Sequence, residues 1–411
     1  MDLETRLEKY AQLIVEKGVA LEAGQELYVS APIQAACFTR VVVKCAYEVG
    51  ASYVTVNWRD DETSRLGFEH AALERFENVA AWEAERSNSM ARNGAAVLTI
   101  LSDDPEAMCG IDQKKVMART VALHTACKEF YDALDFGRTR WCIVGAASEP
   151  WATKVFPKLS PDIAVKRLWK AILDTARVDE DPLAAWDAHR ASFDARKEWL
   201  NAQHFDCLRY RSANGTDLTV GLLEKGHWEG GGQEDADGTY FFPNIPTEEI
   251  YTSPDCLRVD GVVHSALPLI HNGSPVRDFW IRFEDGKAVE WDAKEGADVL
   301  AGIIGTDEGS CYLGEVSLVP YRSPIRDTGI LFYETLYDEN ASCHLALGKG
   351  FPETYEHGYD MSSEELLAAG VNDSAAHVDF MVGTDDLQVT GVRADGTEVS
   401  VFTDGNWACE V

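Results

Sequence analysis

Residues 26–58, ELYVSAPIQAACFTRVVVKCAYEVGASYVTVNW, decide the fold class of the first half of this chain. Residues 26–30 predict a strand, and residues 34–48 predict a helix that stops at Gly50. Apolar and polar side chains alternate along residues 52–58, which predicts a second strand. A strand–helix–strand unit of this kind implies two parallel strands joined by a crossover.

The segments on either side extend this pattern to about residue 203. Apolar residues recur at helical spacing near the start of the chain, and short apolar runs follow the first unit. We therefore expect an α/β domain with a mostly parallel sheet. The further predicted elements are strands at residues 95–101 and 141–144, and helices at residues 3–14, 114–131, 161–177 and 182–203.

The second half of the chain consists of short apolar runs joined by turn dipeptides. Asn-Gly and Asp-Gly pairs favour the tight turns of β-hairpins. We expect an N-terminal α/β domain at residues 1–205 and a mixed, largely antiparallel α+β metal-binding domain at residues 206–411. The pairs that support this prediction are Asn214-Gly215, Asp285-Gly286, Asp395-Gly396 and Asp404-Gly405.

The composition is that of a globular protein with an unusual charge. A chain of 411 residues exceeds the ~250–300 at which single cores stop growing, so two domains are expected. Asp and Glu total 69 against 37 Lys and Arg, a formal net charge of −32. This charge repels phosphate backbones and anionic lipid, so neither nucleic acid nor a membrane is an expected partner. We interpret it as a solvated acidic surface; the alternative is attraction of cationic ligands such as peptide amines.

Other features favour a cytoplasmic protein and give no support to a nucleotide-binding site. The ten cysteines include no C-x-x-C pair, and their scatter is typical of reduced thiols. The first residues lack a basic region followed by an apolar run, and no apolar run approaches the ~20 residues that cross a bilayer. No Gly-x-Gly-x-x-Gly or Walker motif follows a predicted strand, which argues against a nucleotide site.

Four segments of the second half place carboxylates and imidazoles in settings unlike a solvated face. In residues 244–254, two prolines and an asparagine bracket Glu248 and Glu249. The alternative there is a turn and a helix start, whose dipole favours glutamate. Residues 314–320 place Glu315 in an apolar run, where a buried carboxylate is costly unless it is paired or binds a metal. The alternative for Glu315 is an exposed strand edge.

The other two segments contain histidines. Glu339 and His344 are five residues apart, which does not fit one helix face, so a loop or bend must present them. His344 is alternatively a satisfied core histidine. His377 and Asp379 occupy positions i and i+2 of a predicted strand and should point to the same side. They are alternatively a hydrogen-bonded core pair.

Together these segments supply carboxylate oxygens and imidazole nitrogens, with no thiolate. Such donors suit Zn²⁺, Co²⁺, Mn²⁺ or Mg²⁺. Two such ions ~3.5–4 Å apart can ionise a water molecule and polarise a carbonyl group. The donor set is therefore typical of a hydrolytic site with two metals.

The four segments resemble the aminopeptidase T, aminopeptidase S and PepS family of metallo-aminopeptidases. They read Asn-x-Pro-Thr-Glu-Glu, Gly-Glu-Val, Asp-Glu-Asn-Ala-x-x-His-x-Ala-x-Gly and His-x-Asp-x-Met-x-Gly, in that order. The likeness covers nearly the whole chain, including residues 7–29, 216–222 and 395–397. The resemblance implies a homodimer with its active site facing an internal cavity, and two divalent metal ions. The ligands that it implies are Glu249, Glu315, Glu339, His344, His377 and Asp379.

The resemblance also implies the reaction. A metal-dependent aminopeptidase of this family hydrolyses N-terminal amino acids from short peptides through a water activated by two metal ions. Glu315 is expected to serve both metals and to handle protons. In the first segment, Glu248 is the alternative ligand to Glu249. The alternative functions are another two-metal amidohydrolase and a catalytically weak, metal-loaded relative that binds peptides.

One position departs from the family pattern. The family usually carries a tyrosine seven residues after the histidine of the third segment, placed to assist at the tetrahedral intermediate. Here that position is Phe351, and Tyr355 lies four residues further on. We predict that Tyr355 takes over the catalytic role, since its hydroxyl can donate to a developing oxyanion. The alternative is that Tyr355 lies on a surface loop.

Overall fold

The chain forms two compact units. A computed structural model describes residues 1–271 and 273–409. Unit 1 comprises Met1–Ala188 and Gly232–Pro246, and unit 2 comprises His189–Gly231 and Thr247–Val411. Residues 205 and 206, between which the sequence predicts a domain boundary, both lie in unit 2. A division into folding domains at that point stays a prediction.

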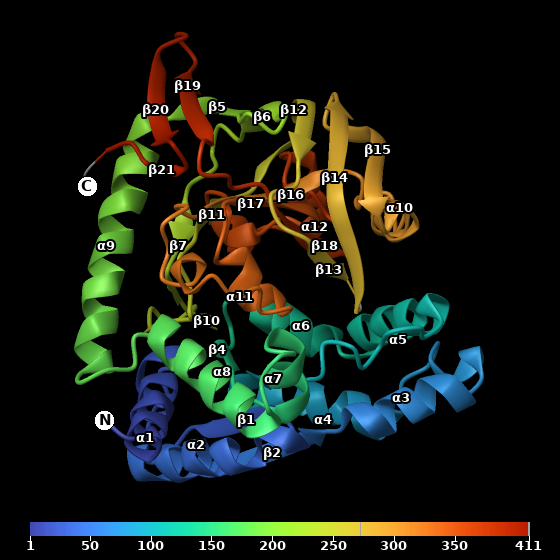
Figure 1. Ribbon diagram of the computed structural model, residues 1–411, viewed down its shortest axis with the longest axis vertical. Helices are drawn as coiled ribbons and strands as arrows, with labels where there is room; N and C mark the ends of the chain where they lie inside the picture. The colour runs from blue at the N-terminus through green and yellow to red at the C-terminus, as the bar shows by residue number, and fades with distance from the viewer. Residues whose placement is uncertain (272, 410–411) are drawn as a thin grey trace. The chain divides into compact units, whose positions relative to one another are not determined.

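Unit 1 is built on a five-stranded parallel sheet with the strand order β10-β4-β3-β1-β2 (Figure 1). β1 and β2 pair in parallel, as the strand–helix–strand pattern predicts. β10 pairs in parallel with β4, so a distant part of the chain completes the sheet. The strands are β1 (Glu26–Pro32), β2 (Tyr53–Arg59), β3 (Ala96–Leu101), β4 (Trp141–Gly145) and β10 (Asn244–Ile245); β8 (Gln233–Glu234) and β9 (Tyr240–Phe241) form a separate ribbon.

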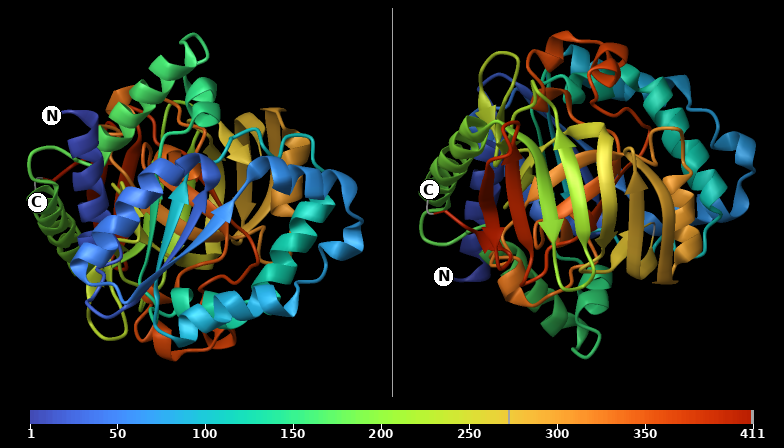
Figure 2. Two further views of the ribbon diagram at one scale, coloured as in Figure 1. Left: turned by 90° about the horizontal axis from the view of Figure 1, so that it is seen from below. Right: turned by 90° about the horizontal axis from the view of Figure 1, so that it is seen from above.

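Helices flank this sheet, as the left view of Figure 2 shows. Phe38 of α2 lies between two helices, with its ring centroid 5.3 Å from that of Tyr10 in α1 and 5.4 Å from that of Trp169 in α8. Such edge and stacked contacts bind the helices into one core. The helices of unit 1 are α1 (Leu3–Leu13), α2 (Ala36–Val49), α3 (Asp61–His70), α4 (Ala81–Arg92), α5 (Gln113–Ala126), α6 (Lys128–Asp135), α7 (Glu149–Val155) and α8 (Pro161–Thr175). The long helix α9 (Pro182–Gln203) begins in unit 1 and continues into unit 2.

The structure corrects two helix predictions in unit 1. α3 and α4 were not predicted, and neither contains a buried residue, so neither shows the apolar periodicity that reveals a helix. The single helix predicted at residues 114–131 is two helices with a break at Cys127. Asn88 satisfies backbone groups at the break: its side chain donates to Ala126 O at 3.0 Å and accepts from Phe130 N at 3.2 Å.

Unit 2 contains two antiparallel sheets, of nine and five strands. The larger sheet has the order β13-β14-β12-β6-β5-β19-β20-β21, with β15 beside β14, and fills the right view of Figure 2. Its strands are β5 (Phe205–Arg211), β6 (Asp217–Leu222), β12 (Pro254–His264), β13 (Leu269–His271), β14 (Ser274–Glu284), β15 (Lys287–Glu295), β19 (Gln388–Arg393), β20 (Glu398–Thr403) and β21 (Asn406–Trp407).

The smaller sheet has the order β18-β17-β16-β11-β7. One of its faces packs in a continuous apolar core with the larger sheet, which includes Val316, Leu345 and Phe380 from the smaller sheet and Val220 and Ile281 from the larger. The strands are β7 (Glu229–Gly230), β11 (Ile250–Thr252), β16 (Leu313–Leu318), β17 (His344–Gly348) and β18 (His377–Met381), and the short helices of unit 2 are α10 (Ala297–Ile304), α11 (Thr335–Glu339) and α12 (Ser363–Ala368).

The turn dipeptides correctly predicted the hairpins of unit 2. Asn214-Gly215 lies between β5 and β6, which pair antiparallel. Asp285-Gly286 joins β14 to β15, Asp395-Gly396 joins β19 to β20, and Asp404-Gly405 joins β20 to β21. The mostly parallel sheet of unit 1 and the antiparallel sheets of unit 2 confirm the predicted fold class.

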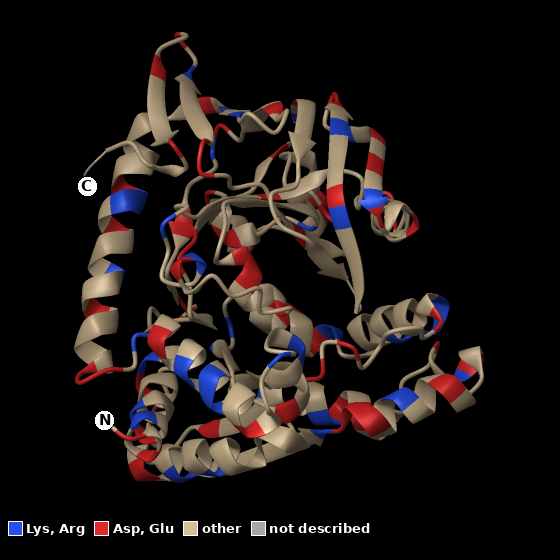
Figure 3. Ribbon diagram, viewed as in Figure 1, with Lys and Arg blue, Asp and Glu red and all other residues tan. Residues whose placement is uncertain are grey.

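The acidic residues are distributed over both units (Figure 3). They account for the formal net charge of −32 and are not confined to one element. Among the described helices, none combines the length and apolarity that crossing a bilayer requires.

Candidate metal centre

One face of the smaller sheet of unit 2, with the order β18-β17-β16-β11-β7, carries polar side chains that the sequence predicts as ligands. Side chains alternate along a strand, so Glu315 and Ser317 of β16 point to one side while Val316 and Leu318 point into the apolar core. The same alternation puts His377 and Asp379 of β18 on a common side, as predicted. Strand periodicity therefore separates a ligand face from a core face.

The register of the strands brings these side chains together. Glu315 pairs with Ala346, which in turn pairs with Asp379 on the next strand. Ala346 is small and leaves room between the two carboxylates. His344 pairs with Ser317, so the imidazole lies in the neighbouring row. Glu315 and Asp379 thus share one surface although they are more than 60 positions apart in the sequence.

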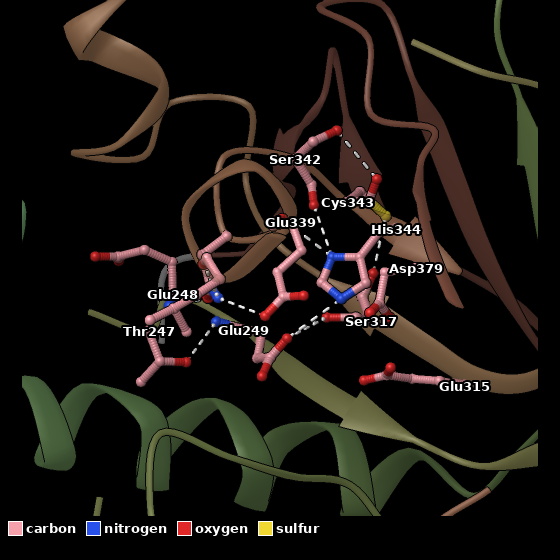
Figure 4. A network of polar contacts seen from close by, with 12 residues as sticks. Thr247, Glu248, Glu249, Glu315, Ser317, Glu339, Ser342, Cys343, His344 and Asp379 are labelled. Carbon is pink, nitrogen blue, oxygen red and sulfur yellow. Dashed lines mark hydrogen bonds and ion pairs between the residues drawn. The ribbon is translucent and has the colours of Figure 1, made fainter. Parts of the chain in front are cut away.

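Glu249 reaches this surface from the residue before β11. Its Oε2 lies 3.3 Å from Ser317 Oγ and 3.3 Å from His344 Nε2 (Figure 4). Glu248 is directed elsewhere, with its Oε2 3.9 Å from His189 Nε2. The geometry therefore favours Glu249 over Glu248 as the ligand of the first segment.

Five of the six predicted ligands form two groups that share one residue. Glu249, Glu315 and His344 offer ligand atoms that all lie within 4.8 Å of one another. Glu315, His377 and Asp379 do the same. Glu315 belongs to both groups, and the residue is 4% exposed.

Both imidazoles are held with one nitrogen toward the carboxylates. His344 Nδ1 lies 3.1 Å from Glu339 O and 3.0 Å from Ser342 O, and His377 Nδ1 lies 2.8 Å from Lys349 O. A carbonyl oxygen only accepts hydrogen bonds, so each Nδ1 carries the proton. Each Nε2 is then the nitrogen available as a metal ligand, an arrangement that orients metal-binding histidines in many proteins.

Gly314 allows the loop that orients His377 to approach β16. A Cβ atom at this position would lie 2.2 Å from Lys349 O and 2.3 Å from Gly348 O. Any larger residue would push away the carbonyl that accepts from His377 Nδ1. This contact gives a physical reason for a glycine directly before Glu315.

Burial and neighbouring charges shift the pKa values of the side chains in the site. Burial raises the pKa of Glu315 to about 7, against the hydrogen bond from His377. Burial lowers the pKa of His344, but the hydrogen bond with Glu249 and the charge of Glu315 outweigh it and raise that pKa to about 9. Burial also opposes ionisation of Asp379, yet the neighbouring His377 brings the pKa of this carboxyl well below its usual range.

Glu339 lies close to the two groups without belonging to either. It is the last residue of α11, and its carboxylate lies beside Glu249 and His344 in Figure 4. Burial, together with the charges of Asp379, Glu249 and Glu315, raises the pKa of Glu339 well above its usual value. Glu339 ends α11 and His344 begins β17, and the bend between them agrees with the prediction that the two do not share a helix face.

The two aromatic residues at positions 351 and 355 have different surroundings. The ring centroid of Phe351 lies 5.0 Å from that of His377 and 5.2 Å from that of Tyr251. Tyr355 instead packs against a small apolar cluster that contains Leu223 and Val371. These contacts do not support Tyr355 as an oxyanion donor, and its catalytic role stays a prediction.

Sequence reasoning missed the residues that position the ligands. Ser317 bonds to Glu249, the carbonyls of Ser342 and Lys349 orient the imidazoles, and Asn340 contacts two ligand segments. Ser317 and Asn340 lie close to predicted ligands in the second and third segments, and this proximity is the one signal that the sequence offered. Backbone carbonyls leave no trace in a sequence.

The residues present fit divalent metal ions. The site holds the four carboxylates of Glu249, Glu315, Glu339 and Asp379, and within the described part of the chain no Lys or Arg forms an ion pair with them. Carboxylate oxygens and neutral imidazole nitrogens are donors that suit Zn²⁺, Co²⁺, Mn²⁺ and Mg²⁺. Buried carboxylates that lack a cationic partner are costly, and bound cations would remove that cost.

Comparisons with known proteins agree with this chemistry. The sequence profile described as "Thermophilic metalloprotease (M29)" matches residues 3–407. Aminopeptidase AmpS from Bacillus subtilis (strain 168) is 44% identical over 404 residues, which cover 98% of each chain. The solved structure of wild-type AmpT from Thermus thermophilus aligns with a TM-score of 0.92 at 39% identity, covering 99% of this chain and all of that one.

A more distant structure shares the fold alone. The 2,5-dihydroxypyridine dioxygenase of Pseudomonas putida KT2440 aligns with a TM-score of 0.52 at 10% identity. Because a fold can host unrelated chemistry, this likeness carries no argument about function. The full-length match to the family profile and the identity to its named members decide the assignment: the chain belongs to the M29 family of metalloproteases.

Proposed function

We propose that this metal-dependent aminopeptidase removes amino acids from the N-termini of short peptides with two divalent metal ions. As an M29 member whose relatives are named aminopeptidases, the chain is a hydrolase of peptide bonds. The proposal adds the number of ions and their ligands, which are Glu249, Glu315, Glu339, His344, His377 and Asp379.

One observation carries the proposal. Two groups of possible ligands, each with an imidazole and carboxylates, share Glu315. A carboxylate has two oxygens and can serve two cations at once, so a shared carboxylate suits a pair of ions. The formal charge of the four carboxylates would be balanced by two divalent cations, which supports the same number.

The ligands and the residues around them have separate tasks. Divalent ions bound at this site would supply an activated water molecule and polarise the scissile carbonyl group. We assign to Glu315 the transfer of a proton from that water to the leaving nitrogen. The water oxygen adds to the carbonyl carbon, the C–N bond breaks, and the proton ends on the released amine. The carbonyls behind His344 and His377 hold a proton on each Nδ1 and orient both imidazoles, so that each Nε2 faces the carboxylates.

A second candidate is a metal-loaded relative that binds peptides and turns them over weakly. Phe351 favours it, because the ring beside His377 carries no hydroxyl that could stabilise an oxyanion. Turnover of aminoacyl p-nitroanilides or dipeptides at ordinary rates excludes this candidate. A panel that includes non-peptide amides separates the aminopeptidase from another two-metal amidohydrolase.

We further propose that the chain acts as a homodimer. In unit 1, α3, α4 and α5 bury none of their residues and expose large apolar side chains. Leu66, Trp82, Met117 and Val121 are between 43% and 67% exposed, and a second copy of the chain would cover them. Sedimentation velocity should give a dimer for the parent protein, and Trp82→Glu should shift it toward the monomer.

We propose the cytoplasm as the compartment. All ten cysteines are free thiols, and the exposed ones include Cys37 and Cys109. Thiols persist in reducing compartments, whereas oxidising ones favour disulfides.

Removal and return of metal tests the proposed function. Exhaustive chelation should abolish hydrolysis of a dipeptide, and re-addition of Zn²⁺, Co²⁺, Mn²⁺ or Mg²⁺ should restore it. Full activity in a preparation that elemental analysis shows to be metal-free would overturn the proposal.

A further inference from the structure

The side chain of Asn340 is buried completely and makes three hydrogen bonds, two of them to residues of the ligand segments. The residue is 0% exposed and follows Glu339 at the end of α11. Its Oδ1 accepts from the backbone N–H of Glu248 at 2.7 Å. Its Nδ2 donates to Leu336 O at 2.9 Å and to Glu339 Oε1 at 3.3 Å. Every polar atom of this amide is therefore used.

These bonds join two of the four segments that supply carboxylates, those of Glu249 and Glu339. The N–H of Glu248 belongs to the residue next to Glu249, so the bond from Asn340 fixes the backbone that presents Glu249. The same amide holds the carboxylate of Glu339. Leu336 O anchors Asn340 to α11, which leaves the amide little freedom to rotate.

The same turn also orients an imidazole. His344 Nδ1 donates to Glu339 O, so a shift of the chain at residues 339 and 340 would move His344 as well as Glu339. Glu249 and His344 are both members of the first ligand group. Asn340 is thus linked to Glu249 through the adjacent Glu248, and to His344 through the adjacent Glu339, which are two of the three members of that group.

We propose that Asn340 is a positioning residue that sets the separation of the Glu249 and Glu339 segments and thereby tunes metal affinity at the first ligand group. The inference rests on the proposed function, since it requires metal ions at this site. Asn340 acts through other residues and need not touch the substrate. Without it, the buried N–H of Glu248 would lose its acceptor and the mutual repulsion of the carboxylates would spread the ligands.

Asparagine suits this role better than its closest relatives. An alanine removes the donor and the acceptor together. An aspartate keeps the acceptor for Glu248 N–H but replaces the group that donates to Leu336 O and to Glu339 Oε1 by a second acceptor. Asn340→Asp therefore loses the two bonds that Nδ2 donates and keeps the one that Oδ1 accepts, whereas Asn340→Ala loses all three.

Asn201 provides a matched control in the same unit. Its side chain makes a similar pair of backbone bonds, accepting from Trp228 N at 2.7 Å and donating to Trp228 O at 3.2 Å. Asn201 contacts none of the predicted ligands. Asn201→Asp should thus reproduce the structural cost of the substitution without the effect on the metal site.

The test measures affinity for Zn²⁺ by competition with a chelator, together with kcat and KM for a dipeptide. We expect Asn340→Ala and Asn340→Asp to weaken Zn²⁺ binding by about 10–100-fold, the usual effect of altering a residue that orients a ligand. The loss of activity should be reversed by excess Zn²⁺, which a general folding defect would not allow. Asn201→Asp should bind Zn²⁺ as the parent does.

Two results would count against different claims. If the parent binds Zn²⁺ and both Asn340 variants bind it with equal or higher affinity, the role of Asn340 is overturned while the proposed function stands. If the folded parent binds no divalent ion, the proposed function itself fails. Should Asn340→Ala not fold, Asn340→Asp decides alone, since it keeps the volume and the acceptor of the native residue.

Discussion

Unit 1 and unit 2 each bring carboxylates together at a sheet, but they balance the charge differently. In unit 1, Arg59 at the end of β2 pairs with Asp103 at 2.9 Å and donates to Ser30 Oγ at 2.7 Å. In unit 2, Glu249 and Glu315 meet imidazoles and no Lys or Arg within the described residues. The first cluster contains its own cation, and the second does not.

The difference distinguishes a structural cluster from a binding site. A buried carboxylate must be paired, protonated or bound to a metal, because desolvation disfavours its charged form. Asp103 is partly exposed to solvent and pairs with Arg59, so it needs no further cation. The carboxylates of unit 2 interact with His344 and His377, whose pKa values they raise, and bound cations would take the place of these protons. Charge that the chain itself leaves unbalanced is the physical sign of the metal centre.

Loss of the shared carboxylate should have the largest effect. Glu315→Gln keeps the size of the side chain but removes the charge that both ligand groups share. We expect kcat to fall by at least about 10²–10³-fold, as when one stabilising group is removed from other hydrolases, and metal binding to weaken at both groups. Steady-state kinetics and elemental analysis measure the two effects.

Asp103→Asn is the matched change in unit 1. The ion pair of Arg59 with Asp103 is partly exposed, so its loss should cost about 0–1 kcal/mol of stability and leave kcat unchanged. If Asp103→Asn impaired hydrolysis as strongly as Glu315→Gln, the distinction between the two clusters would be invalid.

Loss of the second ligand group should affect one ion more than the other. His377→Ala and Asp379→Ala each remove a ligand that only this group contains. We expect each variant to stay folded, to lose more than about 100-fold in kcat and to retain close to one ion per chain. Near-normal activity and metal content in both variants would show instead that His377 and Asp379 are a hydrogen-bonded core pair and not metal ligands.

The metal-free protein should become less stable as the pH rises. The raised pKa values of Glu315, about 7, and of His344, about 9, mean that the folded state binds more protons than the unfolded state. Stability from these groups is present at low pH and is lost between about pH 5 and pH 9. Thermal unfolding in a chelator should show a falling Tm over this range.

The metal-loaded protein is the comparison for that measurement. Protons compete with metal for the same ligands, so bound metal should stabilise the fold increasingly as the pH rises. A Tm of the metal-free protein that rises with pH across the whole range would contradict the assigned protonation.

The smallest effects should come from the aromatic positions. Because Phe351 and not Tyr355 contacts His377, we expect Tyr355→Phe to change kcat by no more than about twofold, as for most substitutions away from special sites. Phe351→Tyr should change kcat more, since it introduces a hydroxyl beside the site. If Tyr355→Phe instead lost much of kcat with little change in KM, the Tyr355 hydroxyl would be the hydrogen-bond donor to the oxyanion.

Local signals predicted much of the fold. Turn dipeptides located the hairpins, and α9 spans the residues that its pattern predicted. The signals failed where structure depends on distant contacts. The return of Gly232–Pro246 to unit 1 arises from the pairing of β10 with β4, which no local pattern indicates. α3 and α4 were missed because they bury no side chain.

The candidate site divides in the same way. Strand periodicity alone placed His377 and Asp379 on one side. The meeting of Glu315 with Asp379 depends on the register of three strands, which only the resemblance to a family could anticipate. The choice between Glu248 and Glu249 needed the geometry around Ser317 and His344. The hydrogen bonds of Asn340 required the folded structure.

Counting the metal ions tests the central claim most directly. The purified protein, loaded with Zn²⁺ or Co²⁺ and dialysed to remove loosely bound metal, is analysed for metal and protein in the same sample. Two ligand groups that share Glu315 predict close to two ions per chain in the parent and fewer in Glu315→Gln. One ion per chain in a fully active parent, or none, would contradict a centre of two metals built on this carboxylate.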